Sequence, residues 1–251
     1  MKRDPISAAR RMLGASVIVA ALMSAGAADA ALTTPKCLAK KVGAWGKLRS
    51  CQRGAHVKEI QAKPFDALKC EVTFQKALAK LDEQATKAAI GCRYRDGGDG
   101  TVTDYDTGLQ WEKKTGFVAN AQSAGFCVAN DLHCVNTRHT WFKAGELANI
   151  FNGTTTDGSL VLLDIFAGHS DWRLPTIVEL RSIVDVSVPG CGSGTPACIA
   201  PIFGPTYPSS YWSGSVINTN QVAATEFLSG TLVLPIFKAG DTLARVVRTA
   251  F

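Results

Sequence analysis

The residues of this sequence that could do chemistry are cysteines, histidines and a group of aspartates. His133 directly precedes Cys134, so a cysteine–histidine nucleophile is one interpretation of this stretch. However, Cys127 and Cys134 are seven residues apart in a loop-like stretch, and so are Cys191 and Cys198. In an oxidising compartment each such pair is expected to close a local disulfide loop. We therefore expect these cysteines to be structural and predict no catalytic residue.

Metal binding is the second kind of chemistry to consider. The histidines are scattered without the short spacing of a zinc site, at His56, His133, His139 and His169. Four aspartates could offer oxygens to Ca²⁺, namely Asp96, Asp99, Asp104 and Asp106. EF-hand spacing is absent, and Asp beside Gly forms turns equally well. We expect turns at these aspartates, with no metal and no cofactor.

Composition and the first residues indicate an exported folded protein. The chain has 251 residues, of which 46% are hydrophobic and 19% charged, and this excludes a disordered chain. A basic start, an apolar stretch from Met12 to Ala28 and the small residues that follow predict a signal peptide, residues 1–30. After cleavage no further stretch is long and apolar enough to span a membrane. We expect a periplasmic or extracellular location, and disulfides persist there.

Charge divides the rest of the chain into two parts. Residues 31–92 are rich in Ala and Lys and carry 12 basic and 5 acidic side chains, a net charge of +7. Residues 93–251 are rich in Gly, Thr, Ser, Val and aromatics and carry 11 basic and 14 acidic side chains, a net charge of −3. Both signals predict a boundary near Cys92.

The first part has the pattern of a helical hairpin. One apolar stripe contains Cys37, Ala44, Leu48 and Cys51, and we expect Gly54 and then Pro64 to mark its break. We expect Pro64 to open a second helix and Gly91 to end it. The apolar stripe of that second helix comprises Ala67, Cys70, Phe74, Ala77, Leu81, Ala85 and Ala88.

The cysteines of the hairpin are expected to form nested disulfides. Cys37 and Cys51 would lie roughly 21 Å apart along one helix, whereas a disulfide needs Cα atoms within about 7 Å. The same argument excludes a Cys70–Cys92 bond. The pairs Cys51–Cys70 and Cys37–Cys92 fit an antiparallel hairpin best.

The lysines of residues 31–92 have two interpretations. One is a basic face for an anionic partner such as acidic polysaccharide or lipid headgroups. The other is the solvated face of an amphipathic helix, because Lys is a good helix former. The spread of Lys and the scarcity of Arg favour the solvated face. Export argues further against nucleic acid as a partner.

Residues 93–251 have β-rich patterning with two helices. Turn signals at Asp99-Gly100 and Thr107-Gly108 predict consecutive short strands within 93–112. Thr140 is expected to cap a helix that reaches Phe151, and Thr176 with Glu179 forms a capping box for another. Further strands are expected at Tyr211–Ser213, Ala223–Leu228, Thr231–Ile236 and Arg245–Arg248.

A family resemblance accompanies these patterns. Residues 93–251 resemble the Lcl C-terminal domain family, a bacterial extracellular domain named from a collagen-like adhesin. The matching blocks are DGTVTD at 99–104, TGLQW at 107–111, Thr140-Trp141, SDWRLPT at 170–176 with Glu179-Leu180, the segment Ser209 to Ser213, and RVVR at 245–248. The resemblance implies a C-type-lectin-like α+β fold, which the helical hairpin precedes.

The resemblance also bears on activity. Formylglycine-generating enzymes of the same superfamily share the Arg-Leu-Pro-Thr motif and use active-site cysteines, one of them near the chain end. This sequence has Val246 there, which argues against such an enzyme. The Glu-Pro-Asn and Gln-Pro-Asp motifs of Ca²⁺-dependent lectins are absent. The domain of the namesake adhesin binds sulfated polysaccharide, but residues 93–251 are acidic, so a basic contact would have to come from the hairpin.

The candidates for ligand binding lie in the family blocks. Trp111, Trp172 and Trp212 could stack on a sugar if exposed, although aromatic residues of this size are more often core. Asp171 and Arg173 flank Trp172 and are expected either to pair with each other or to line a surface site. We expect a non-enzymatic adhesion module for extracellular glycan or protein. The alternatives are a structural envelope protein with an oligomerising hairpin and a formylglycine-generating-type enzyme.

Overall fold

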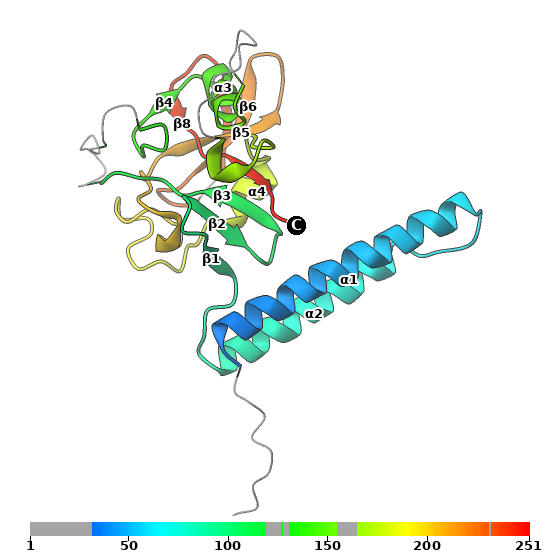
Figure 1. Ribbon diagram of the computed structural model, residues 1–251. Helices are drawn as coiled ribbons and strands as arrows, with labels where there is room; N and C mark the ends of the chain where they lie inside the picture. The colour runs from blue at the N-terminus through cyan, green and yellow to red at the C-terminus, as the bar shows by residue number, and fades with distance from the viewer. Residues whose placement is uncertain (1–31, 119–126, 128–130, 155–164, 231) are drawn as a thin grey trace, which may run out of the picture. The chain divides into compact units, whose positions relative to one another are not determined.

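The computed structural model describes residues 32–118, 127, 131–154, 165–230 and 232–251. Residues 32–251 form one compact unit that contains both helices and sheets, so the fold is α+β (Figure 1). The predicted signal peptide, residues 1–30, lies outside the described residues. Within these ranges, no helix combines the length and the apolar character that crossing a bilayer requires.

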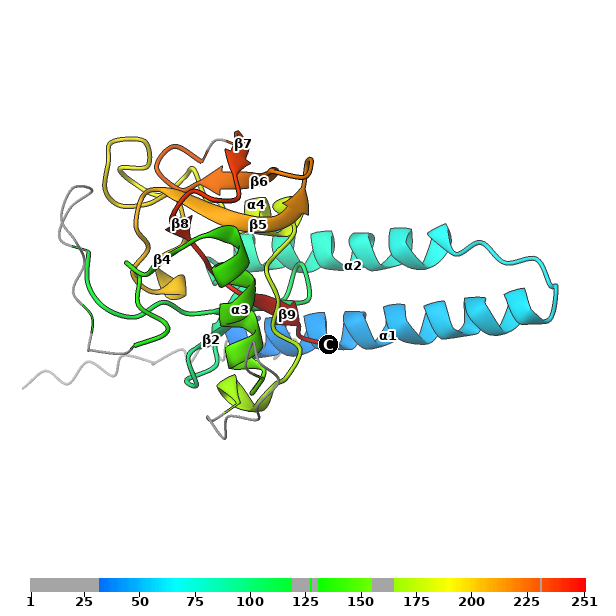
Figure 2. The same ribbon diagram turned by 90° about the horizontal axis from the view of Figure 1, so that it is seen from above.

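Two long helices form the hairpin. Helix α1 (Thr34–Ile60) and helix α2 (Leu68–Lys87) lie side by side up to the turn that joins them (Figures 1 and 2). Apolar residues recur every three or four positions on both helices, and this spacing lets each helix bury one stripe against the other. The buried hydrophobic residues of this interface are Leu38, Ala44, Leu48, Phe74, Leu78, Leu81 and Ala85.

Disulfides fix both the hairpin and two loops. Cys37 bonds to Cys92 and Cys51 to Cys70, each with a Cα–Cα distance of 5.8 Å, and these are the nested pairs that the sequence favoured. The local loops are closed by Cys127–Cys134 and Cys191–Cys198. All eight cysteines are therefore paired.

The ends of the two helices differ from the predicted ones. Helix α1 continues through Gly54 to Ile60, because an exposed glycine costs only about 1 kcal/mol in a helix interior. Pro64 lies in the turn and does not open α2. Helix α2 begins at Leu68, whose backbone N–H donates to the Asp66 carboxylate at 3.0 Å. Helix α2 ends at Lys87 and not at Gly91, since Ala89 adopts the positive φ of 50° that closes the helix.

The first sheet follows the predicted turns. Its strand order is β1-β2-β3-β9, and all its neighbours are antiparallel. Gly100 and Gly108 have φ of 86° and 70°, which the two turns require. The strands are β1 (Tyr94–Asp96), β2 (Thr101–Asp104), β3 (Leu109–Glu112) and β9 (Val247–Thr249).

The second sheet has the order β4-β8-β5-β6-β7. Its strands are β4 (Arg138–His139), β5 (Ser210–Val216), β6 (Gln221–Glu226), β7 (Leu232–Phe237) and β8 (Thr242–Leu243). The predicted strand 231–236 thus overlaps β7, although Thr231 lies outside the described residues. Predicted strand 245–248 begins only at Val247, because the Arg245 side chain turns inward to bind carbonyls and the Val246 N–H binds a carboxylate.

Short helices complete the α+β part. Helix α3 (Trp141–Phe151) starts at the predicted cap Thr140, whose hydroxyl accepts the Lys143 N–H at 3.4 Å. Helix α4 (Ile177–Ser182) has the predicted capping box of Thr176 and Glu179. Two 3₁₀ turns are η1 (Phe166–Gly168) and η2 (Pro201–Phe203).

Two apolar clusters hold the α+β part together, and a third joins it to the hairpin. One cluster lies between the sheets and α4, and another packs α3 against β5 and β6. Tyr105 and Phe251 pack against the Cys37–Cys92 end of the hairpin. At the same junction Trp45 Nε1 donates to the Tyr105 carbonyl at 2.9 Å, and buried Lys41 pairs with Asp106.

Candidate functional site

The three motif tryptophans lie in the core. Trp111 and Trp212 are fully buried, and Trp172 is 2% exposed. Trp172 Nε1 donates to the Phe166 carbonyl at 3.0 Å, and Trp212 Nε1 donates to the His139 carbonyl at 2.7 Å. These side chains therefore hold the fold together and offer no stacking surface to a sugar.

Arg173 organises the start of helix α4. Its guanidinium binds both carboxylate oxygens of Glu179, at 2.6 and 2.7 Å. The same Glu179 also caps the backbone of Thr176. Asp171 pairs instead with Arg248 at 2.6 Å, so the expected pair between Asp171 and Arg173 is wrong. The register of β9 explains this, since the backbone of Arg173 pairs with Val247 and brings Arg248 beside Asp171.

The strongest group of ionisable side chains surrounds Glu112 at the end of β3. Glu112 is fully buried and accepts hydrogen bonds from Lys114 Nζ at 2.7 Å and the Val246 N–H at 3.1 Å. His133 Nδ1 lies 3.0 Å from the same carboxylate. Lys114 is itself 4% exposed. The cluster joins β3, the Cys127–Cys134 loop and the entry to β9.

The electrostatics of Glu112 suit a structural charge rather than a proton donor. Burial acts to raise its pKa, but attraction to Lys114 and contact with His133 outweigh burial and hold the pKa at about 2. Burial also lowers the pKa of Lys114, against the attraction of Glu112. Glu112 therefore stays ionised at neutral pH. Cys134, the predicted alternative nucleophile beside His133, is held in a disulfide.

The aspartates form turns, as the sequence favoured. Asp96 accepts the Gly98 N–H at 3.0 Å, and Asp99 accepts the Thr101 N–H at 3.1 Å. Asp104 accepts the Asp106 N–H at 3.0 Å in the same way. Across the part of the chain that the structure describes, no group of three or more His, Cys, Asp or Glu is placed to hold a metal ion.

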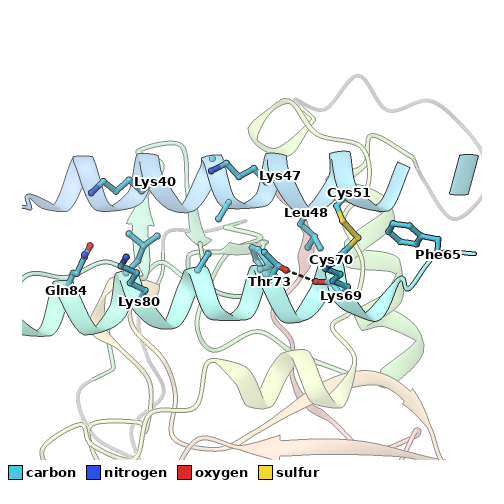
Figure 3. A pocket seen from close by; sticks show the side chains of 15 residues that line it. Lys40, Lys47, Leu48, Cys51, Phe65, Lys69, Cys70, Thr73, Lys80 and Gln84 are labelled. Atoms are coloured by element: carbon cyan, nitrogen blue, oxygen red, sulfur yellow. Dashed lines mark hydrogen bonds between the residues drawn. A yellow bond between two sulfur atoms is a disulfide. The ribbon is translucent and has the colours of Figure 1, made fainter. Parts of the chain in front are cut away.

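A groove on the hairpin has a distinct chemical character. It runs between α1 and α2 and has a volume of about 700 Å³ (Figure 3). The floor contains the Cys51–Cys70 disulfide and the buried side chains of Ala44, Leu48 and Phe74. Phe65 lies at the end near the turn (Figure 3). The floor is therefore apolar.

The rim of the groove is basic. Lys40 and Lys47 line it from α1, and Lys69 and Lys80 line it from α2 (Figure 3). No acidic residue lines the groove. Within the described ranges none of the four ammonium groups takes part in an ion pair, whereas Lys41 and Lys87 of the same helices do. The four lysines leave an excess of positive charge above an apolar floor.

Sequence reasoning did not single out this arrangement. Lysines spread along a sequence indicate a solvated face, and only the pairing of the helices brings two rows of lysine together. One signal was present, because Lys40 and Lys47 are seven residues apart and so lie on one side of α1.

Comparison with known proteins decides the family. The Lcl C-terminal domain family matches residues 100–248, which is more than half of the chain. The chain belongs to the Lcl C-terminal domain family. No curated protein matches the sequence.

The Lcl C-terminal domain match begins at residue 100, after the residues that line the groove. Its range includes all three motif tryptophans, Arg173 and the Glu112 cluster, which the structure places in the scaffold. Helices α1 and α2 lie before residue 100 and outside the match. Membership of a family of extracellular domains agrees with the four disulfides. The hairpin therefore lies in a part of the chain that the family match does not cover.

Proposed function

We propose that the protein is an exported, non-enzymatic binding module that recognises an anionic partner at the cell surface through the groove between α1 and α2. The observation that carries the proposal is the row of unpaired lysines on both sides of an apolar floor. Positive charge attracts an acidic ligand, and the floor rewards a ligand with an apolar face.

The geometry favours an acidic amphipathic segment of another protein. The groove follows α1 from Lys40 to Cys51, a length of about 16 Å at about 1.5 Å per residue. That is about three helical turns, the usual scale of helix-in-groove recognition. Gly43 is exposed, with nothing within 4 Å of a Cβ built on it, so a third helix can approach closely. Acidic side chains beside the apolar stripe of the bound partner helix would form ion pairs with the rim lysines.

Several observations support a role without catalysis. Every cysteine is in a disulfide, so none provides a free thiolate. Val246 stands where formylglycine-generating enzymes carry a cysteine, and it is buried with its N–H on Glu112. Glu112, the most perturbed carboxyl, is sealed from solvent by its partners.

For the α+β part we propose the C-type-lectin-like fold that the family resemblance implies. Two sheets, the helices α3 and α4, and the pairing of the last strand β9 with β3 support this assignment. Its role in the proposal is to display the hairpin. The Cys37–Cys92 bond and the Lys41–Asp106 pair anchor the hairpin to this scaffold.

Binding measurements with defined probes test the proposal. The full exported chain is titrated with a labelled acidic amphipathic peptide, with heparin as a sulfated polysaccharide, and with neutral dextran. We expect the peptide to bind with an affinity that falls as salt rises, and dextran not to bind. Binding of heparin without binding of the peptide would indicate that the partner is a glycan and not a protein. No binding to either anionic probe would remove the proposal.

A second copy of the chain is a poorer occupant, and this bears on the alternative of an oligomerising envelope protein. A second hairpin would bring the same four lysines to the groove, and like charges facing each other are destabilising. Light scattering with size exclusion measures this directly, and a stable dimer through the groove would favour the envelope protein instead.

A further inference from the structure

The turn of the hairpin carries an unusual set of exposed apolar side chains. Ile60 is 73% exposed, Leu68 68%, Val57 51% and Phe65 36%. All four lie within the last helical turn of α1, the connecting turn and the first residue of α2, where no other element of the described chain covers them (Figure 2). We call Val57, Ile60, Phe65 and Leu68 the apolar tip.

Basic side chains flank the apolar tip. Lys58 and Lys63 lie within it in sequence, and Lys58 Nζ is 5.1 Å from the centre of the Phe65 ring. The two acidic residues of this segment are engaged locally, because Glu59 lies 3.5 Å from His56 and Asp66 accepts the N–H that begins α2. Arg53 and Lys69 continue the basic flank on each helix.

This combination distinguishes the tip from the groove. The groove is a hollow between two helices, with its large side chains buried at the floor. The tip is the end of a hairpin, and its large side chains project outward at the turn. A projecting apolar side chain cannot be buried by a ligand that needs a cavity. It can be buried by insertion into the apolar region of a lipid bilayer.

Charge complementarity points to the kind of surface. Amphipathic segments at a lipid surface bury Leu, Ile and Phe at the boundary between headgroups and acyl chains, while Lys and Arg extend to the headgroups. Each basic residue near an anionic leaflet adds to the electrostatic attraction. Lys58 lies beside the Phe65 ring, and Lys63 lies in the turn that connects the two helices.

We propose that the apolar tip inserts into the surface of a bilayer that contains anionic lipid. The tip is then a peripheral membrane contact that adjoins the groove, because Phe65 belongs to both. From Ile60 to the rim residue Lys47 is about 20 Å along α1, and neither Ile60 nor Leu68 lines the groove, so these two tip residues can be varied without removing a groove-lining side chain.

Vesicle binding by the full, oxidised chain tests this proposal. Vesicles of equal parts phosphatidylglycerol and phosphatidylcholine are compared with phosphatidylcholine alone in co-sedimentation. We expect binding to the anionic vesicles, and a loss of roughly 100-fold or more in I60S/L68S, because two exposed apolar side chains lose their burial. K58Q/K63Q is expected to weaken binding to the anionic vesicles alone.

Two further variants make the result decisive. V178S/V186S removes two exposed apolar residues away from the tip, 77% and 69% exposed, and is expected to bind as the unaltered chain does. A tryptophan at the tip, L68W, is expected to shift its emission to the blue and to be quenched by brominated acyl chains. Absence of vesicle binding, or equal binding by I60S/L68S with an unchanged circular dichroism spectrum, would overturn the proposal. So would a loss in I60S/L68S that light scattering traces to a dissociated dimer.

Discussion

The hairpin and the α+β part differ in where several of their charged and large apolar side chains lie. In the α+β part, charged groups turn inward, as Glu112, Lys114 and Arg245 do, and the large aromatic residues of the family motifs are buried. In the hairpin, lysines line a groove without partners and large apolar side chains project at the turn. The motif tryptophans and the Glu112 cluster within the family match lie in the scaffold, and we propose that the hairpin carries the binding surfaces.

The largest expected effect breaks the scaffold. E112Q leaves buried Lys114 without its counter-charge, and removing one partner of a buried pair typically costs about 3–5 kcal/mol. The matched variant in the hairpin is E83Q, whose exposed pair with Lys87 contributes at most about 0.5 kcal/mol. Urea unfolding of both variants measures the contrast. Similar losses of unfolding free energy in E112Q and E83Q would contradict the contrast between the buried charges of the α+β part and the exposed charges of the hairpin.

Disulfides provide the next contrast. Cys37–Cys92 closes a loop of 55 residues and Cys191–Cys198 a loop of 7. Loop-closure entropy then predicts a loss of roughly 4 kcal/mol for C37S/C92S and roughly 2 kcal/mol for C191S/C198S. Thermal unfolding monitored at the far-ultraviolet helix signal measures both. The hairpin is expected to lose helix in the first variant and to keep it in the second; loss in both would show that the hairpin depends on the loop as well.

The pH dependence of stability reports on the same buried carboxylate. The pKa of Glu112 is about 2 in the folded state against 4.5 for an unperturbed glutamate. A lowered folded pKa contributes stability that is fully present above pH 4.5 and is lost as the pH falls toward 2. We expect the chain to lose stability in this window and E112Q to lose less there. An unchanged slope in E112Q would assign the acid sensitivity to other carboxylates.

Much of the scaffold could be predicted from the sequence, because its signals are local. Asp99-Gly100 and Thr107-Gly108 specify turns by their backbone requirements, and Thr176 with Glu179 caps α4 through neighbouring atoms. Cysteine spacing together with the predicted helices excluded pairs along one helix, and the predicted antiparallel hairpin favoured the nested disulfides.

The remaining features depend on contacts between distant residues. The partner of Asp171 is Arg248, which the register of β9 brings beside it. The groove forms only when α1 and α2 pair. From the sequence alone, the pattern of the rim lysines therefore predicts only a solvated helix face.

The smallest expected effect on stability accompanies the largest expected effect on binding. K40Q/K47Q/K80Q removes three exposed, unpaired charges from the groove, so its free energy of unfolding is expected to change by less than about 0.5 kcal/mol. K36Q/K76Q/K87Q removes the same charge from the same two helices away from the groove. The two variants have equal net charge. They differ in where the lysines stood, and K87Q also removes the exposed pair of Lys87 with Glu83.

The affinity of these two variants for the labelled acidic amphipathic peptide tests the central claim most directly. If the groove is the binding surface, K40Q/K47Q/K80Q should bind roughly 10-fold or more weakly and show a shallower salt dependence, with K36Q/K76Q/K87Q within about twofold of the unaltered chain. Equal losses in the two variants would show that only the overall charge of the hairpin matters, and would contradict the assignment of the site to the groove.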